Sequence, residues 1–308
     1  MPLSGHELIS RRRLAMLAAV TAAIPSTAWG QDASPQMPGG DEYAHPGMLV
    51  EAASLAAGLD SGDPGVLVAF MAGSDAAGGV IPGSGRIDWP DLETADTSDA
   101  GLTAWVALID DHLTALGITP STQVTVYDPG TLFATRLWWV LHAVGHREIR
   151  VLNGGLAAWS SDGRPIDPAV AAPTPTVESY GAFLDLTAIA PIAEVEAAVG
   201  SEGVTFIDAR SPQEWEAGHI PGAINLPYER NVVPESPRTW LAAAGLDALY
   251  ADVPRENLVI PYCSSGVRSA VTAFTLRLIG YPDVRLFTGS WNEWITDSSH
   301  PVTVGTTP

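Results

Sequence analysis

The chain contains no lysine, so its 15 basic residues are all arginines, and 35 aspartates and glutamates outnumber them. The formal net charge of −20 repels phosphate backbones and anionic lipid head groups. We therefore expect neither nucleic acid nor a membrane surface among the partners of this protein. Over most of its area, so acidic a surface serves solubility.

Cysteine is almost as scarce, because Cys263 is the single example in 308 residues. One cysteine excludes a disulfide within the chain, a redox-active cysteine pair and a cysteine-rich zinc site. Any chemistry that needs a thiol therefore depends on Cys263.

Long hydrophobic runs are also rare, and the first apolar run, residues 14–24, is too short to cross a bilayer. It follows the arginines 11–13 and precedes small residues that suit cleavage after Ala28 or Gly30. This order predicts a signal peptide over residues 1–30 that resembles a twin-arginine signal, with an uncleaved anchor as the alternative. We predict a flexible lead-in over residues 31–44. The domains that follow would be periplasmic or otherwise exported.

Beyond residue 45 the chain alternates short apolar runs with helical patterns. Leu102, Val106 and Ile109, for example, share one helical face. Such alternation predicts an α/β fold in which helices flank parallel sheets. The predicted strands are 66–72, 123–128, 149–152, 204–208, 258–262 and 284–287, and the predicted helices are 102–116, 132–144 and 267–279.

The two halves of the chain repeat each other at a constant offset of 135 residues, which aligns Gly145 with Gly280 and Trp159 with Trp294. We therefore predict two copies of one domain, 45–163 and 186–303, joined by a proline-rich linker over 164–185. The offset places Asp128 opposite Cys263, so only the second copy carries a thiol.

The stretch "CSSGVRS" places that thiol at the end of a predicted strand, just before a helix. Ligands collect at this end of strands in open parallel sheets, and the helix N-terminus adds partial positive charge. We expect Cys263 to be a nucleophilic thiolate with a lowered pKa in a cradle for an anion. The cradle would consist of Ser264, Ser265, Gly266, Val267 and Arg268.

Two chemistries use a cradle of this kind. A phosphatase of the protein-tyrosine type has five residues between cysteine and arginine, whereas four separate Cys263 from Arg268. The shorter loop favours a sulfur atom bound to the thiolate over a whole phosphate group. Phosphate-ester hydrolysis remains an alternative at this point.

The segment "FIDARSPQEWEAGHIPGAINLPY" resembles the signature of the rhodanese family. The stretch "VYDPGTLFATRLWWVLHAVGHREIRVLNGGLAAW" is similar to the non-catalytic copy of tandem rhodaneses. The resemblance implies two rhodanese-like domains, the second of them catalytic. It also implies thiosulfate sulfurtransferase activity without a metal or organic cofactor. Cys263 would take sulfur from a small anionic donor as a persulfide and pass it to cyanide or a thiol.

The resemblance also bears on residues around the loop. Asp208 and Arg210 are expected to pair at a strand end, with Arg210 a further contact for the donor. We expect His219 to fix the turn of "GHIPGA" through ring hydrogen bonds. Trp291 and Glu293 are expected at the rim of the pocket. Core or interface packing is expected for Trp138, Trp139, Trp159 and Trp294.

Two alternatives to thiosulfate turnover remain. A 3-mercaptopyruvate sulfurtransferase usually has threonine where Arg268 stands, and an arginine fits an inorganic dianion better. A persulfide carrier without turnover would hold sulfur for a protein acceptor. The first copy has Val80 in place of the histidine of "GHIPGA" and lacks the aspartate–arginine pair. These departures argue against a chemical role for the first domain.

Overall fold

The computed structural model describes residues 42–62, 65–71, 78–94, 96–172, 174–176 and 178–307. The predicted signal peptide, and residues 31–41 of the predicted lead-in, lie outside the described residues. Among the helices of the described part, none is long and apolar enough to cross a membrane.

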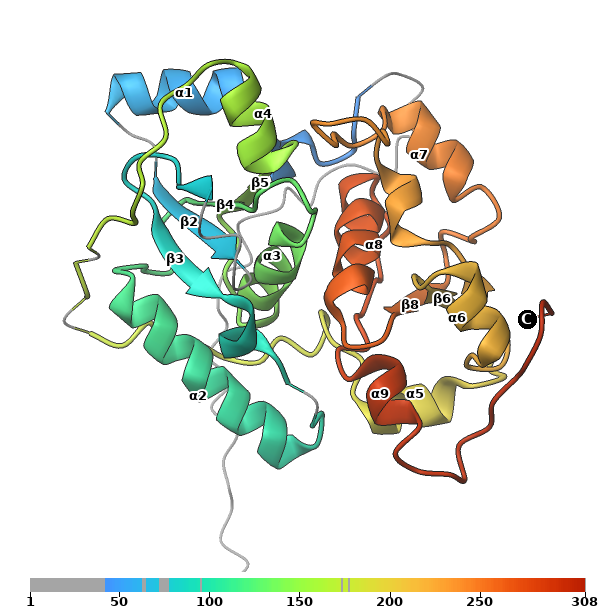
Figure 1. Cartoon of the computed structure of the whole chain (residues 1–308). Coiled ribbons are helices and arrows are strands. Elements are labelled where there is room, and N and C mark those ends of the chain that lie inside the picture. Colours follow the sequence, from blue (N-terminus) through green and yellow to red (C-terminus); the bar gives the residue numbers. More distant parts are fainter. Residues whose placement is uncertain are drawn as a thin grey trace, which may run out of the picture. The chain divides into compact units, whose positions relative to one another are not determined.

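The first sheet has five parallel strands in the order β1-β5-β4-β2-β3 (Figure 1). Within one strand, Leu67 and Ala69 pack in one hydrophobic cluster, and Val68 and Phe70 pack in another. This alternation shows that both faces of the sheet are covered. The strands are β1 (Leu49–Val50), β2 (Val66–Met71), β3 (Gly85–Asp88), β4 (Val124–Tyr127) and β5 (Ile149–Leu152).

Helices cover the two faces of this sheet in pairs. α1 (Ala52–Ser61) and α4 (Gly155–Ser161) contribute to the cluster on one face. α2 (Asp99–Ala115) and α3 (Ala134–Ala143) contribute to the cluster on the other. Ser98 caps α2 because its side chain accepts a hydrogen bond from the Gly101 N–H. Two short 3₁₀ helices lie at Pro46–Met48 and Trp89–Leu92.

The second sheet has parallel strands in the order β7-β6-β8, from β6 (Val204–Asp208), β7 (Ile224–Asn225) and β8 (Leu258–Tyr262). The strand predicted at 284–287 is present only as isolated parallel bridges, Val259↔Val284 and Ile189↔Leu286. Pro261 explains the interruption, because it has no N–H with which β8 could continue the ladder. The first domain has Val126 at the equivalent position, and its ladder continues.

The helices of the second half correspond to those of the first. α8 follows β8 as α3 follows β4, and the hydroxyls of Tyr127 and Tyr262 accept the N–H of Ile81 and Ile220 at 2.9 and 3.1 Å. These equivalent contacts confirm the predicted repeat. The helices are α5 (Ile192–Ala198), α6 (Pro212–Ala217), α7 (Ala243–Leu249), α8 (Val267–Leu278) and α9 (Ser290–Trp294), and a 3₁₀ helix spans Tyr228–Asn231.

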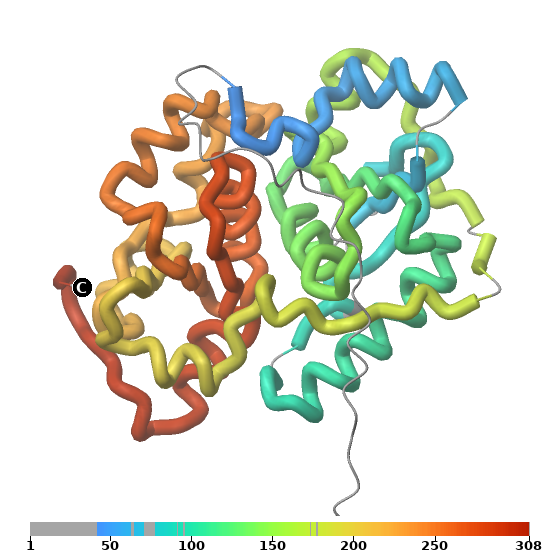
Figure 2. The backbone as a smooth tube through the Cα atoms, turned by 180° about the vertical axis from the view of Figure 1, so that it is seen from behind, coloured from blue at the N-terminus to red at the C-terminus, as the bar shows by residue number. Residues whose placement is uncertain are grey.

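The equivalent helices α3 and α8 pack against each other, as Figures 1 and 2 both show. Trp138 and Phe274 meet edge to face with ring centroids 5.0 Å apart. One hydrophobic cluster includes buried residues of both helices, so the two domains share a core. The four tryptophans assigned to packing, Trp138, Trp139, Trp159 and Trp294, are all buried.

Candidate active site

Cys263 lies directly after β8 and is only 1% exposed, and its thiol is free. Its N–H donates to the Ser290 hydroxyl at 3.2 Å, and its carbonyl accepts from the Trp291 N–H at 3.0 Å. The next carbonyl, that of Ser264, accepts from Asn292 N–H at 3.0 Å. The start of α9 thus fixes the loop by binding its carbonyls.

Gly266 ends the loop in the left-handed conformation, with φ +83°, and is the N-cap of α8. A Cβ at this position would lie 2.6 Å from the Thr288 carbonyl oxygen and 3.1 Å from Nη1 of Arg136. Both the backbone angle and the close neighbours therefore require glycine. Val267 begins α8 and is buried, while Ser264 and Ser265 are half-buried at the rim.

The pKa of the Cys263 thiol is lowered although the group is buried. Burial acts to raise this pKa, but hydrogen bonds from the Ser269 side chain and from the Ser269 and Ser265 backbones oppose it. The positive charge of Arg268 acts in the same direction as these bonds. Their combined effect favours the thiolate, as expected for a cysteine at a helix N-terminus beside an arginine.

Arg268 reaches the loop from the first turn of α8 and is already engaged. Its guanidinium makes two parallel bonds to the Glu214 carboxylate, at 2.8 and 2.7 Å, and a third to the Ser264 hydroxyl at 2.7 Å. The Arg268 bond lowers the pKa of Glu214 to about 2. The same pair raises the pKa of Arg268, so the arginine stays charged. A dianion entering the loop would meet a fixed cation.

Arg210 is 3% exposed and lies in a bidentate ion pair with Asp208, including Nη2–Oδ2 at 2.6 Å. Nη2 also donates to the Gly218 carbonyl at 2.7 Å, and the guanidinium stacks on Trp291 at 4.5 Å. The predicted pair with Asp208 is confirmed. The hydrogen bonds of Arg210 go to the protein itself, so its proposed contact with the donor needs a rearrangement.

His219 is fully buried and stacks on Trp215 with centroids 4.3 Å apart. Its ring nitrogens lie 2.8 Å from the Trp215 carbonyl and 3.1 Å from that of Thr307. The predicted structural role in the turn is therefore confirmed.

The two residues expected at the rim of the pocket have different surroundings. Trp291 packs beside the loop on Gly218. The Glu293 carboxylate instead accepts hydrogen bonds from the N–H and O–H of Thr97 in the first domain.

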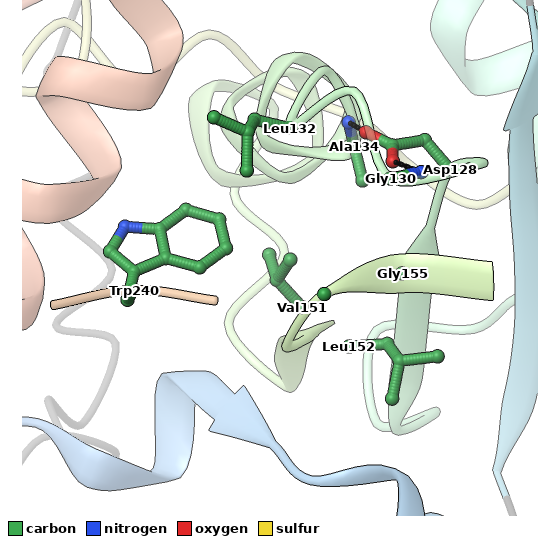
Figure 3. Close-up of a pocket in the computed structure, with 9 residues that line it drawn as sticks. Asp128, Gly130, Leu132, Ala134, Val151, Leu152, Gly155 and Trp240 are labelled. Carbon is green, nitrogen blue, oxygen red and sulfur yellow. Dashed lines mark hydrogen bonds between the residues drawn. The ribbon is translucent and has the colours of Figure 1, made fainter. Parts of the chain in front are cut away.

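The equivalent loop of the first domain shows what the aspartate does there. The Asp128 carboxylate accepts the N–H groups of Gly130 at 2.6 Å, Thr131 at 2.9 Å and Ala134 at 2.7 Å. Figure 3 shows it turned toward Gly130 and Ala134. The adjoining cavity, which Trp240 also lines, measures about 10 Å³, room for about one water molecule. The carboxylate therefore occupies the donors that an external anion would need.

Three residues near Cys263 carry signals that the sequence analysis did not use. Glu214 lies within the rhodanese-like signature, but its partner Arg268 is 54 residues away. Ser269 follows the loop, and its buried side chain lowers the pKa of the Cys263 thiol. Arg136 is the one charged residue of the stretch "ATRLWWVLHA" in the first domain.

No group of three or more His, Cys, Asp and Glu side chains in the described residues could hold a metal ion.

Fold and site together define a protein of two α/β domains with one free thiol in the loop between β8 and α8. Residues 52–162 and 192–297 match the rhodanese-like domain, and the chain belongs to that family.

Several curated proteins are similar over most of their length. A thiosulfate sulfurtransferase of Corynebacterium glutamicum is 34% identical over 298 residues, 87% of this chain and 94% of the relative. A probable 3-mercaptopyruvate sulfurtransferase of Pseudomonas aeruginosa is 36% identical, covering 63% of this chain and 72% of the relative. The sulfur carrier protein TtuD of Thermus thermophilus is 30% identical, covering 82% and 95%.

Among solved structures, the anaerobic ergothioneine biosynthesis enzyme from Chlorobium limicola is similar, with a TM-score of 0.74 at 25% identity. The match covers 86% of this chain and 72% of that one. It agrees with the two-domain fold.

Proposed function

We propose that this protein is a sulfurtransferase that takes the outer sulfur of thiosulfate and passes it to cyanide or a thiol. The Cys263 thiolate attacks that sulfur, the S–S bond of thiosulfate breaks, and its electron pair leaves with sulfite. The persulfide anion on Cys263 then gives its terminal sulfur to the acceptor, which regenerates the thiolate. This double displacement predicts ping-pong kinetics.

One observation carries the proposal: the lowered pKa of Cys263 in a loop that also holds Arg268. A thiolate is the form of cysteine that attacks sulfur, and the loop N–H groups would stabilise the persulfide charge. The similarity to the Corynebacterium glutamicum thiosulfate sulfurtransferase supports the same donor. Arg268 favours an inorganic dianion over a keto acid.

The decisive experiment is intact-mass spectrometry of the protein after incubation with thiosulfate or, separately, with 3-mercaptopyruvate. We expect thiosulfate to add one sulfur atom to the wild type and none to Cys263→Ser. Because the chain has one cysteine, the added mass reports on a single site. Loading by 3-mercaptopyruvate alone would overturn the choice of donor, and loading by neither would overturn the proposal.

A persulfide carrier without turnover is the second candidate, since the chain is also similar to the sulfur carrier TtuD. The loaded protein would be mixed with cyanide or with a protein thiol, and discharge followed over repeated cycles. Many cycles with cyanide support an enzyme, whereas discharge to a protein thiol alone supports a carrier. Hydrolysis of p-nitrophenyl phosphate would instead favour the phosphatase alternative.

The N-terminal sequence motivates a separate proposal, that the protein is exported to the periplasm as a folded domain pair. Mass spectrometry of the mature protein from the native host tests it. Cleavage after Ala28 or Gly30 is the expected result, and an intact N-terminus in a soluble cell fraction would contradict it.

A further inference from the structure

Arg136 is a charged residue inside an apolar helix. Its neighbours on α3 include Leu137, Trp138 and Trp139, and its side chain is 1% exposed. The guanidinium lies over the Trp139 ring, 4.7 Å from its centroid. Burying a charge is unfavourable unless other groups compensate it. Its compensation must therefore come from its surroundings.

The hydrogen bonds that Arg136 donates go to uncharged acceptors, and these do not balance its positive charge. Nη1 donates to the Thr288 hydroxyl at 2.9 Å and Nη2 to the Leu92 carbonyl at 3.2 Å. Nε is buried without a partner among the described residues. No carboxylate in the described part of the chain forms an ion pair with this arginine. Glu93, an exposed residue, acts on it only through its charge.

The guanidinium instead borders the loop that holds Cys263. Nη1 lies 3.1 Å from the position that a Cβ of Gly266 would take, so only glycine lets the two approach. Thr288, which accepts the bond from Nη1, places its own carbonyl 2.6 Å from the same point. Burial lowers the pKa of Arg136 to about 10, and negative charge on Cys263 acts against that change.

We propose that Arg136, on the domain that lacks the cysteine, is a positioning residue whose buried charge keeps Cys263 as a reactive thiolate. The inference rests on the proposed function, in which that thiolate is the nucleophile. The first domain then has a chemical role after all: its helix α3 supplies the second cation of the site. Correct packing of α3 on α8 becomes a condition for reactivity.

Charged groups lie around the Cys263 loop on several elements. Arg268 on α8 acts directly, and Glu214 on α6 partly offsets it through the ion pair. Arg136 approaches from α3, and Glu93 acts on Arg136 through its charge. Removing Arg136 should thus weaken the preference for the thiolate without abolishing it, because Arg268 and the loop N–H groups remain.

The test is the pH dependence of Cys263 alkylation by iodoacetamide, which reports one residue because the chain has one cysteine. Arg136→Gln and Arg136→Met both remove the charge; the methionine suits the apolar surroundings if the glutamine variant fails to fold. We expect the thiol to titrate higher and alkylation near neutral pH to slow about three- to tenfold, because at a pH below the pKa a rise of one pKa unit lowers the thiolate fraction by up to about tenfold. Arg136→Lys, which keeps the charge, should stay within about twofold of wild type.

Asn153→Ala is the matched control. Asn153 also joins the two domains, since its side-chain oxygen accepts the Trp240 N–H at 3.0 Å, but it carries no charge. Its loss should leave the alkylation profile unchanged. A folded Arg136→Gln or Arg136→Met with the wild-type profile would overturn the inference. Alkylation does not involve a sulfur donor, so this outcome differs from failure of the proposed function, in which the wild type takes up no sulfur.

Discussion

At the scale of single residues, the chemistry proposed for this protein depends on how a buried sulfur is kept charged. Burial alone raises the pKa of a thiol, so Cys263 needs compensating donors. Ser269, the Ser265 N–H and Arg268 supply them, and the pKa falls below its ordinary value. Gly266 makes the arrangement possible because no larger residue fits between Thr288 and Arg136.

Arg268→Thr tests the electrostatic part of this account. The change removes a cation that faces the thiolate and the binding site of the donor, so we expect kcat/KM for thiosulfate to fall at least about tenfold. Activity with 3-mercaptopyruvate should fall less or rise. Steady-state kinetics with both donors measures the ratio, with Arg164→Thr at the start of the linker as a control that should change neither. Equal loss with both donors would contradict the proposed role in choosing the donor.

At the scale of elements, the same strand–loop–helix unit occurs twice and holds one acidic group each time. After β4 the group is the Asp128 carboxylate, and after β8 it is the sulfur of Cys263. The charged cradle of the second unit is completed from another element, because Glu214 on α6 holds Arg268 on α8. α6 therefore orients the arginine although it carries no group that touches the sulfur.

This link between α6 and α8 predicts a stability effect in acid. The folded-state pKa of Glu214 is about 2, below its ordinary 4.5, so the pair stabilises the fold above about pH 4.5. The contribution is lost as the pH falls through about 2. Because both side chains are partly exposed, we expect a contribution under about 1 kcal/mol.

Urea unfolding of the wild type and of Glu214→Gln at several pH values measures the contribution of this ion pair to the free energy of unfolding. The difference between the two proteins should be largest near neutral pH and shrink as the pH is lowered. Glu216→Gln, on the same helix but exposed, is the control and should match the wild type throughout. A gap between wild type and Glu214→Gln that stays constant down to pH about 2 would rule out the ion pair as its origin.

At the scale of the whole molecule, the two domains are joined by a shared core and by polar contacts around it. α3 and α8 provide the apolar part. Glu293 on α9 adds a polar one, accepting from the Thr97 hydroxyl at 2.8 Å and its N–H at 2.9 Å. Burial raises the pKa of Glu293, and the bonds from Thr97 oppose this rise.

Thr97→Val removes the hydroxyl from this contact and keeps the shape of the side chain. We expect a loss of about 1–2 kcal/mol in the free energy of unfolding, because the half-buried carboxylate loses a donor. Urea denaturation measures it, with the exposed Thr103→Val on α2 as the matched control. Equal stability of the two variants would show that the Thr97 hydroxyl contributes nothing to joining the domains.

The order of helices and strands could be predicted from the sequence because it follows from local patterns of hydrophobic residues. The predicted strands 204–208 and 258–262 coincide with β6 and β8, and the predicted helix 267–279 with α8. The pairing of a strand at the edge of the sheet could not be predicted in this way. The strand expected at 284–287 is reduced to bridges, because its ladder depends on the proline of a neighbouring strand, Pro261.

The sequence by itself determined the repeat, the candidate nucleophile and the loop, because one cysteine, a glycine and an arginine stand at fixed spacing in a few consecutive residues. Only the tertiary structure decided which charges meet there. Glu214 lies 54 residues from its partner Arg268, and Arg136 lies 152 residues from its partner Thr288. Electrostatic attraction depends on distance in space, and folding alone sets that distance.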